Sequence, residues 1–161
     1  MKGGSRLSLR FRWLVLVFLG AILAVAMSGA LGGADSPIVT VNGKEGALTV
    51  EAPATLRNGE FFEMHFIGRA HQALAKPTLA IEGRYWQDLT INTMIPAPAS
   101  ESYEDGFFLF EFDPLDAGKA INLKVDGQVN PPMFGGTRGR LQWRDGDRVL
   151  AEVPIRLRVL P

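Results

Sequence analysis

An uncharged apolar stretch near the amino terminus constrains this chain more than any other feature. The 22 residues 13–34 contain no charged side chain, whereas residues 1–12 contain four bases and no acid. A helix of that length would be about 33 Å long, enough to cross the roughly 30 Å hydrocarbon core of a bilayer. The pattern therefore predicts a transmembrane helix over residues 13–34, preceded by a basic cytoplasmic flank over residues 1–12.

The charges beside this stretch predict an orientation. Basic residues favour the cytoplasmic side of a membrane, so we expect a single-pass cell-membrane protein with a cytoplasmic amino terminus. The carboxy-terminal domain would then be periplasmic or extracellular, bound to the membrane through residues 13–34. The competing interpretation is a cleavable secretory signal, because small residues follow the apolar core at positions 28–30 and 32–34.

Residues 38–161 show the pattern of β-strands rather than of helices. Apolar and polar residues alternate in segments such as 62–66 and 155–159, and Gly, Pro, Asn and Asp separate the segments. Such alternation is typical of strands that bury one face. The pairs Asn42-Gly43 and Asp145-Gly146 suit tight hairpin turns, each joining two neighbouring segments.

The number of these segments predicts the architecture. We expect seven to nine short antiparallel strands, and a sheet with one apolar face must bury that face against another layer. An all-β, two-sheet sandwich follows, with a small closed barrel as the alternative. The chain has no cysteine, so its large apolar side chains have to supply a core without disulfides.

Two turn segments carry a family resemblance. Residues 56–60 (LRNGE) and 114–119 (PLDAGK) precede alternating strands, and in this they resemble the turns of bacterial immunoglobulin-like domains of the cysteine-free type. The resemblance implies an immunoglobulin-like β-sandwich over residues 38–161. As a whole, the chain resembles small single-pass bacterial proteins of unassigned function. Such domains display, space or bind more often than they catalyse.

Composition and missing motifs exclude several classes of function. Residues 35–161 contain 13 bases against 17 acids, whereas a nucleic-acid-binding domain needs a basic surface to neutralise phosphates. No sequence motif of a nucleotide-binding loop, a zinc protease or a serine hydrolase is present. His65 and His71 are the two histidines, and neither has partners at catalytic or metal-ligand spacing. We therefore predict no enzyme, no catalytic residue, no metal, no cofactor and no nucleic-acid partner.

The distribution of charge and of exposed apolar loops suggests a binding surface. Residues 117–161 carry eight bases against four acids, and several arginines alternate with apolar residues, which predicts an arginine-rich outer face. A proline-stiffened apolar loop precedes them. The residues predicted to bind a protein partner at the cell envelope are Pro131, Pro132, Met133, Phe134, Arg138 and Arg140. The alternative is that the arginines pair with acids on neighbouring strands and that the loop caps the core.

A second candidate site involves two adjacent aromatic residues. Tyr85 and Trp86 could form a flat platform on which a sugar ring stacks. This would make the domain a glycan- or small-ligand-binding module, secreted or anchored. The competing interpretation places both rings in the hydrophobic core.

Overall fold

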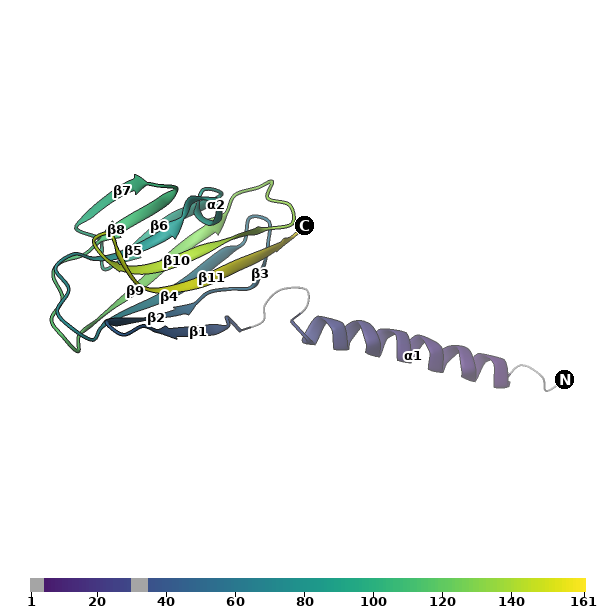
Figure 1. The fold of residues 1–161 in the computed structure, drawn as a ribbon. Helices are drawn as coiled ribbons and strands as arrows, with labels where there is room; N and C mark the ends of the chain where they lie inside the picture. Colours follow the sequence, from purple (N-terminus) through teal and green to yellow (C-terminus); the bar gives the residue numbers. More distant parts are fainter. Residues whose placement is uncertain (1–4, 30–34) are drawn as a thin grey trace.

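The computed structural model describes residues 5–29 and 35–161 as a long amino-terminal helix, two β-sheets and one short helix (Figure 1). In chain order the elements are α1 (Ser5–Met27), β1 (Ile38–Asn42), β2 (Gly46–Glu51), β3 (Thr55–Arg57), β4 (Phe61–Ala70), β5 (Pro77–Glu82), α2 (Gly83–Trp86), β6 (Leu89–Ile95), β7 (Ser100–Glu104), β8 (Phe107–Glu111), β9 (Ala120–Val129), β10 (Thr137–Asp145) and β11 (Arg148–Leu160). The start of the predicted basic flank (1–4) and most of the predicted signal-cleavage region (30–34) lie outside the described residues.

The strands form two sheets that enclose one core, as in a cysteine-free β-sandwich (Figure 1). The five-stranded sheet has the order β1-β2-β4-β9-β6, and the six-stranded sheet has the order β3-β11-β10-β5-β8-β7. Neighbouring strands are antiparallel except β3, which runs parallel to β11. The predicted count of seven to nine strands, all antiparallel, is therefore wrong for the described residues, which contain eleven.

The missed strands explain the wrong count. All five residues of β7 are exposed, and β3 has only three residues. Alternation marks a strand only when one face is buried over several residues. An exposed polar edge strand and a three-residue strand give no such signal.

The two predicted hairpins are confirmed, although the first has a longer turn than expected. β1 pairs with β2, and the chain reverses over residues 43–46, just after Asn42. β10 pairs with β11 across Asp145-Gly146. Gly146 has a φ of 59°, a left-handed conformation that glycine adopts without steric cost. The turn after Asp145 joins the two strands of the long β10–β11 ladder, on which the candidate site lies.

The core confirms the alternation seen in the sequence. Phe62, Met64 and Phe66 of β4 are buried, and Trp143 of the opposite sheet belongs to the same buried cluster. Burying each such side chain stabilises the fold by roughly 2–3 kcal/mol. Gly68 allows the Trp143 ring to lie close, since a Cβ at position 68 would be 2.7 Å from ring atoms.

The predicted transmembrane helix over residues 13–34 is wrong. Within the described residues, no helix combines the length and the apolar character needed to span a bilayer. Helix α1 ends at Met27, and the Ser28 hydroxyl donates a hydrogen bond to the Val25 carbonyl at 2.7 Å. The uncharged part of the helix, residues 13–27, is thus about 22 Å long, shorter than the hydrocarbon core. The single-pass topology and the periplasmic or extracellular location were deduced from this helix, so both are corrected together with it.

Candidate functional site

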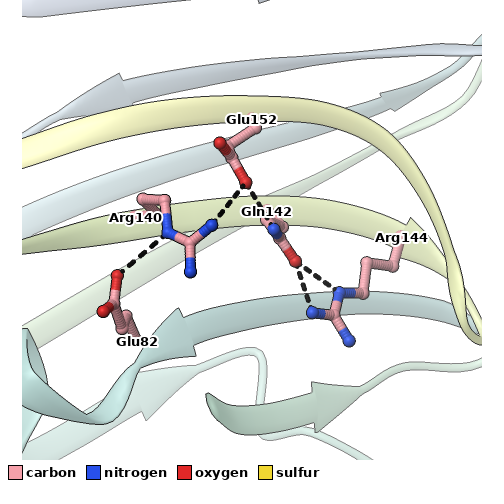
Figure 2. Close-up of polar contacts among 5 residues, drawn as sticks. All are labelled: Glu82, Arg140, Gln142, Arg144 and Glu152. Carbon is pink, nitrogen blue, oxygen red and sulfur yellow. Dashed lines mark hydrogen bonds and ion pairs between the residues drawn. The ribbon is translucent and has the colours of Figure 1, made fainter. Parts of the chain in front are cut away.

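The outer face of the six-stranded sheet carries a polar network (Figure 2). Arg140, Gln142 and Arg144 alternate along β10 with the core residues Leu141 and Trp143. Strand alternation therefore places the three polar side chains on one face. There Arg140 and Gln142 reach acids on the neighbouring strands.

The network balances the charge of Arg140. Its Nε donates to Glu82 Oε2 at 3.1 Å, and its Nη1 lies 3.8 Å from Glu152 Oε2. Gln142 then links Glu152 to Arg144, whose Nε donates to Gln142 Oε1 at 2.7 Å (Figure 2). Arg140 was predicted to bind a partner, but the structure assigns its charge to pairing with Glu82 and Glu152.

An aromatic ring lies beneath two of these arginines. The guanidinium carbons of Arg140 and Arg144 are 5.3 and 4.9 Å from the centroid of the Phe107 ring. Phe107 points to the outer face, and it is nevertheless buried. Both arginines are thus occupied by contacts within the domain: Arg140 by charge pairing and cation–π contact, and Arg144 by its hydrogen bond to Gln142 and cation–π contact.

A different group of arginines lines a groove at the end of the same sheet, next to α2. Arg84, Arg138 and Arg156 border both of two adjoining hollows with volumes of about 360 and 420 Å³, and the Glu82–Arg140 pair borders the first of them. We call the two hollows together the arginine groove. Its second hollow contains one acid, Asp88, and is closed on one side by Gly135 and Gly136 of the loop before β10.

The strand register and one glycine bring the three arginines together. Arg138 on β10 lies directly opposite Arg156 on β11. Arg84 comes from α2, which is held against β10 by a 2.6 Å hydrogen bond from the Thr137 hydroxyl to the Arg84 carbonyl. A Cβ at Gly139 would be 2.8 Å from the Cβ of Tyr85, so glycine permits this close approach.

Arg84, Arg138 and Arg156 form no ion pair within the described residues. Among the residues that the structure describes, no side-chain hydrogen bond or ion pair involves the guanidinium of Arg84, Arg138 or Arg156. All three side chains are exposed. Like charges directly across two antiparallel strands are unfavourable, so the groove holds positive charge that a ligand can neutralise.

The predicted apolar loop divides into an anchor and a tip. The backbone N–H of Met133 donates to Asn58 Oδ1 at 2.9 Å, and the Met133 side chain is only 7% exposed. The Met133 side chain is therefore packed in the core, and the loop is anchored at this residue. Phe134, the next residue, is 74% exposed, and the prolines at 131 and 132 are also exposed.

A second exposed phenylalanine was missed by the sequence analysis. Phe61, the first residue of β4, is 69% exposed, and the Asn58–Glu60 turn before it also holds the loop of Phe134. The alternation assigned Phe62 to the core and gave no reason to examine its neighbour. Arg84 was missed as well, since α2 interrupts the strand pattern that located Arg138.

The aromatic pair proposed for sugar stacking lies in the core. Tyr85 is fully buried and Trp86 is 5% exposed. The Tyr85 hydroxyl donates to Met64 Sδ at 3.9 Å, and burial raises the pKa of this hydroxyl well above its ordinary value. Trp86 packs edge-on against Phe110 with ring centroids 5.9 Å apart. Neither ring forms an exposed platform.

The two histidines have ordinary surface surroundings. His65 Nε2 lies 2.6 Å from Glu63 Oε1, and Lys124 lies 2.5 Å from the other oxygen of that carboxylate. Hydrogen bonds from Lys124 and then from His65 lower the pKa of Glu63. His71 is exposed and lies 3.4 Å from a backbone carbonyl. No group of three or more potential metal-ligating side chains occurs in residues 5–29 and 35–161.

Comparison with known proteins assigns the chain to no family. No protein-family model matches the sequence, and no curated protein matches it either. The function therefore has to be inferred from the arginine groove and the exposed phenylalanines themselves.

Proposed function

We propose that this β-sandwich is a non-enzymatic module that binds a protein partner. The contact surface is the arginine groove together with the exposed tip of Phe134. The observation that carries the proposal is the cross-strand pair Arg138 and Arg156, two like charges that form no ion pair with an acid of the described residues.

The composition of this surface supports a protein partner. Aromatic residues and arginine are enriched in protein interfaces and provide most of their strongest contacts. Phe134 lies directly before the Gly135-Gly136 wall of the groove, so one partner segment can reach both. Its Met133 neighbour is anchored in the core, which limits the entropy lost when the tip is ordered on binding.

An immunoglobulin-like relationship is part of this proposal. In immunoglobulin domains, strands A, B, E and D form one sheet and strands G, F and C belong to the other. The orders β2-β4-β9-β6 and β11-β10-β5 correspond to these two groups. The chain departs from that plan because β6 precedes β7 and β8, whereas strand D follows the additional strands of variable domains.

A quantitative pull-down with single-residue variants tests the proposal. We expect Phe134→Ser and Arg138→Gln each to lower recovery of the partner at least about tenfold, as is usual for central interface residues. The matched control is Ile38→Ser, because Ile38 is similarly exposed but lies on β1 of the other sheet. Melting temperatures should stay nearly unchanged in all three variants. Equal recovery by Phe134→Ser and wild type would overturn the proposed contact surface.

A further inference from the structure

We propose that Arg84, Arg138 and Arg156 form a binding site for one doubly charged oxyanion group, a phosphate or phosphate monoester. The site itself follows from the arginine groove alone. It rests on the proposed function only for the source of the group, since a protein partner that carries a phosphorylated side chain would supply it.

The charge balance of the groove favours a dianion. Three arginines and Asp88 line its second hollow, which leaves two positive charges without a counterpart. A phosphate monoester carries about −1.5 to −2 charges near pH 7 and offers three strong acceptor oxygens. It can therefore neutralise the hollow and accept hydrogen bonds from three guanidinium groups together.

A single carboxylate fits this arrangement less well. Its two oxygens can pair bidentately with one guanidinium fork, and the remaining arginines would stay unbalanced. A ligand that contacts both Arg138 and Arg156, which face each other on neighbouring strands, relieves their repulsion most fully.

The backbone around the site is held by close contacts, which favours a preformed site. Gly136 has a φ of 88°, and a Cβ there would lie 2.0 Å from the Leu157 carbonyl oxygen. The loop wall therefore packs directly on β11, beside Arg156. On the other side, the Thr137 hydroxyl fixes the backbone of Arg84. A ligand thus meets arginines whose backbone positions are already set, which reduces the ordering cost of binding.

Arg158 provides a matched control within the same strand. It lies two residues from Arg156, is exposed on the same side of β11, and borders neither hollow. A non-specific attraction of phosphate to surface arginines would be weakened equally by removing either residue. A built site would be weakened only by removing Arg156.

The first arm of the test measures thermal stability of the full chain in inorganic phosphate and in sodium chloride of equal ionic strength. We expect phosphate at twenty times its dissociation constant to raise the melting temperature of the wild type by about 5 °C. The double variant Arg138→Gln/Arg156→Gln should lose this shift, and Arg158→Gln should keep it. No phosphate-specific shift, or an equal loss in Arg158→Gln, would overturn the site.

The second arm identifies the source of the group by isothermal titration. The probes are inorganic phosphate, a phosphoserine peptide with glycine and serine flanks, and the same peptide without phosphate. Binding of the phosphopeptide at least about tenfold tighter than inorganic phosphate would assign the group to a partner protein, and comparable binding would assign it to free phosphate. Binding of the unphosphorylated peptide as tight as the phosphopeptide would overturn the dianion site.

The two proposals can fail separately. The phosphate measurements involve neither Phe134 nor a partner protein. If phosphate raises the melting temperature as expected but Phe134→Ser recovers the partner as well as wild type does, the anion site is supported and the proposed contact surface is overturned. Partner recovery that depends on Phe134, combined with no phosphate shift, would give the opposite result.

Discussion

Arg138 and Arg140 are two residues apart on β10 and share the outer face of one sheet, but their surroundings differ. Arg140 contacts Glu82, Glu152 and the ring of Phe107, whereas Arg138 faces Arg156 across the strand gap. Two arginines on the same strand face therefore have different roles. The acids and the ring around Arg140 make it a residue that stabilises the fold, whereas Arg138 stays available to a ligand because a like charge faces it.

The largest expected effect comes from removing the Phe107 ring, which lies under Arg140 and Arg144. Phe107→Ala should destabilise the domain by about 3 kcal/mol, because it removes buried apolar surface and leaves a cavity. Urea unfolding measures the change, with the exposed Phe134→Ala as control, expected to change stability by less than about 0.5 kcal/mol. Equal effects for the two substitutions would mean that Phe107 is not part of the packed structure.

Arg148, the first residue of β11, also pairs with an acid, and this contact gives a pH-dependent test. Its Nη2 lies 3.0 Å from Asp145 Oδ2, and the Lys76 backbone N–H donates to Asp145 Oδ1 at 2.8 Å. The Lys76 hydrogen bond first, and then Arg148, lower the pKa of Asp145 below its ordinary value. The charged carboxylate therefore stabilises the fold at neutral pH, and this stabilisation is lost as the pH falls through the lowered pKa.

Asp145→Asn should consequently cost about 1 kcal/mol or less at pH 7, with a smaller difference from wild type near pH 3. Unfolding curves at the two pH values measure it. Asp147→Asn, in the same turn but exposed, should show no such change. A difference that stays constant with pH would contradict the assigned role of the Asp145 charge.

Breaking the Glu82–Arg140 pair should have a smaller effect. Half of the Arg140 side chain is exposed, so water screens the pair and Glu82→Gln should destabilise by less than about 1 kcal/mol. The loss should shrink in 1 M salt, where charges are screened within about 3 Å. Glu104→Gln on β7 is the control. A larger loss in high salt would rule out an electrostatic origin.

The smallest effect should have the opposite sign. Arg138→Gln removes one of two opposed like charges and should stabilise the unliganded domain by a few tenths of a kcal/mol at low salt. Arg158→Gln should leave stability nearly unchanged. Urea unfolding in phosphate-free buffer provides the measurement, and a clear destabilisation by Arg138→Gln would show that Arg138 is held by contacts within the fold.

Alternation and turn residues predicted a large part of the fold. The spacing of Phe62, Met64 and Phe66 identified a buried face, and Asn42-Gly43 and Asp145-Gly146 located two hairpins. The pairing of β10 with β5, which brings Glu82 to Arg140, is a contact between segments more than fifty residues apart. Nothing in local spacing specifies such a contact.

The candidate site was predicted only in part for the same reason. Arg138 and Phe134 were found because an exposed strand face and an apolar loop leave local signals. Arg84 was missed because its place depends on the packing of α2 against Gly139. The uncharged stretch over residues 13–34 predicted a helix long enough to span a membrane. The missing charges gave no sign that the helix ends at Met27.

The free edge at β7 bears on how copies of this domain behave in concentrated solution. An unpaired edge strand is a template on which further strands can add, and proteins commonly block such growth with charge. Glu101 and Glu104 lie within the five residues of β7. A second β7 approaching this edge would bring carboxylates together, so sheet-to-sheet polymerisation through this strand is disfavoured.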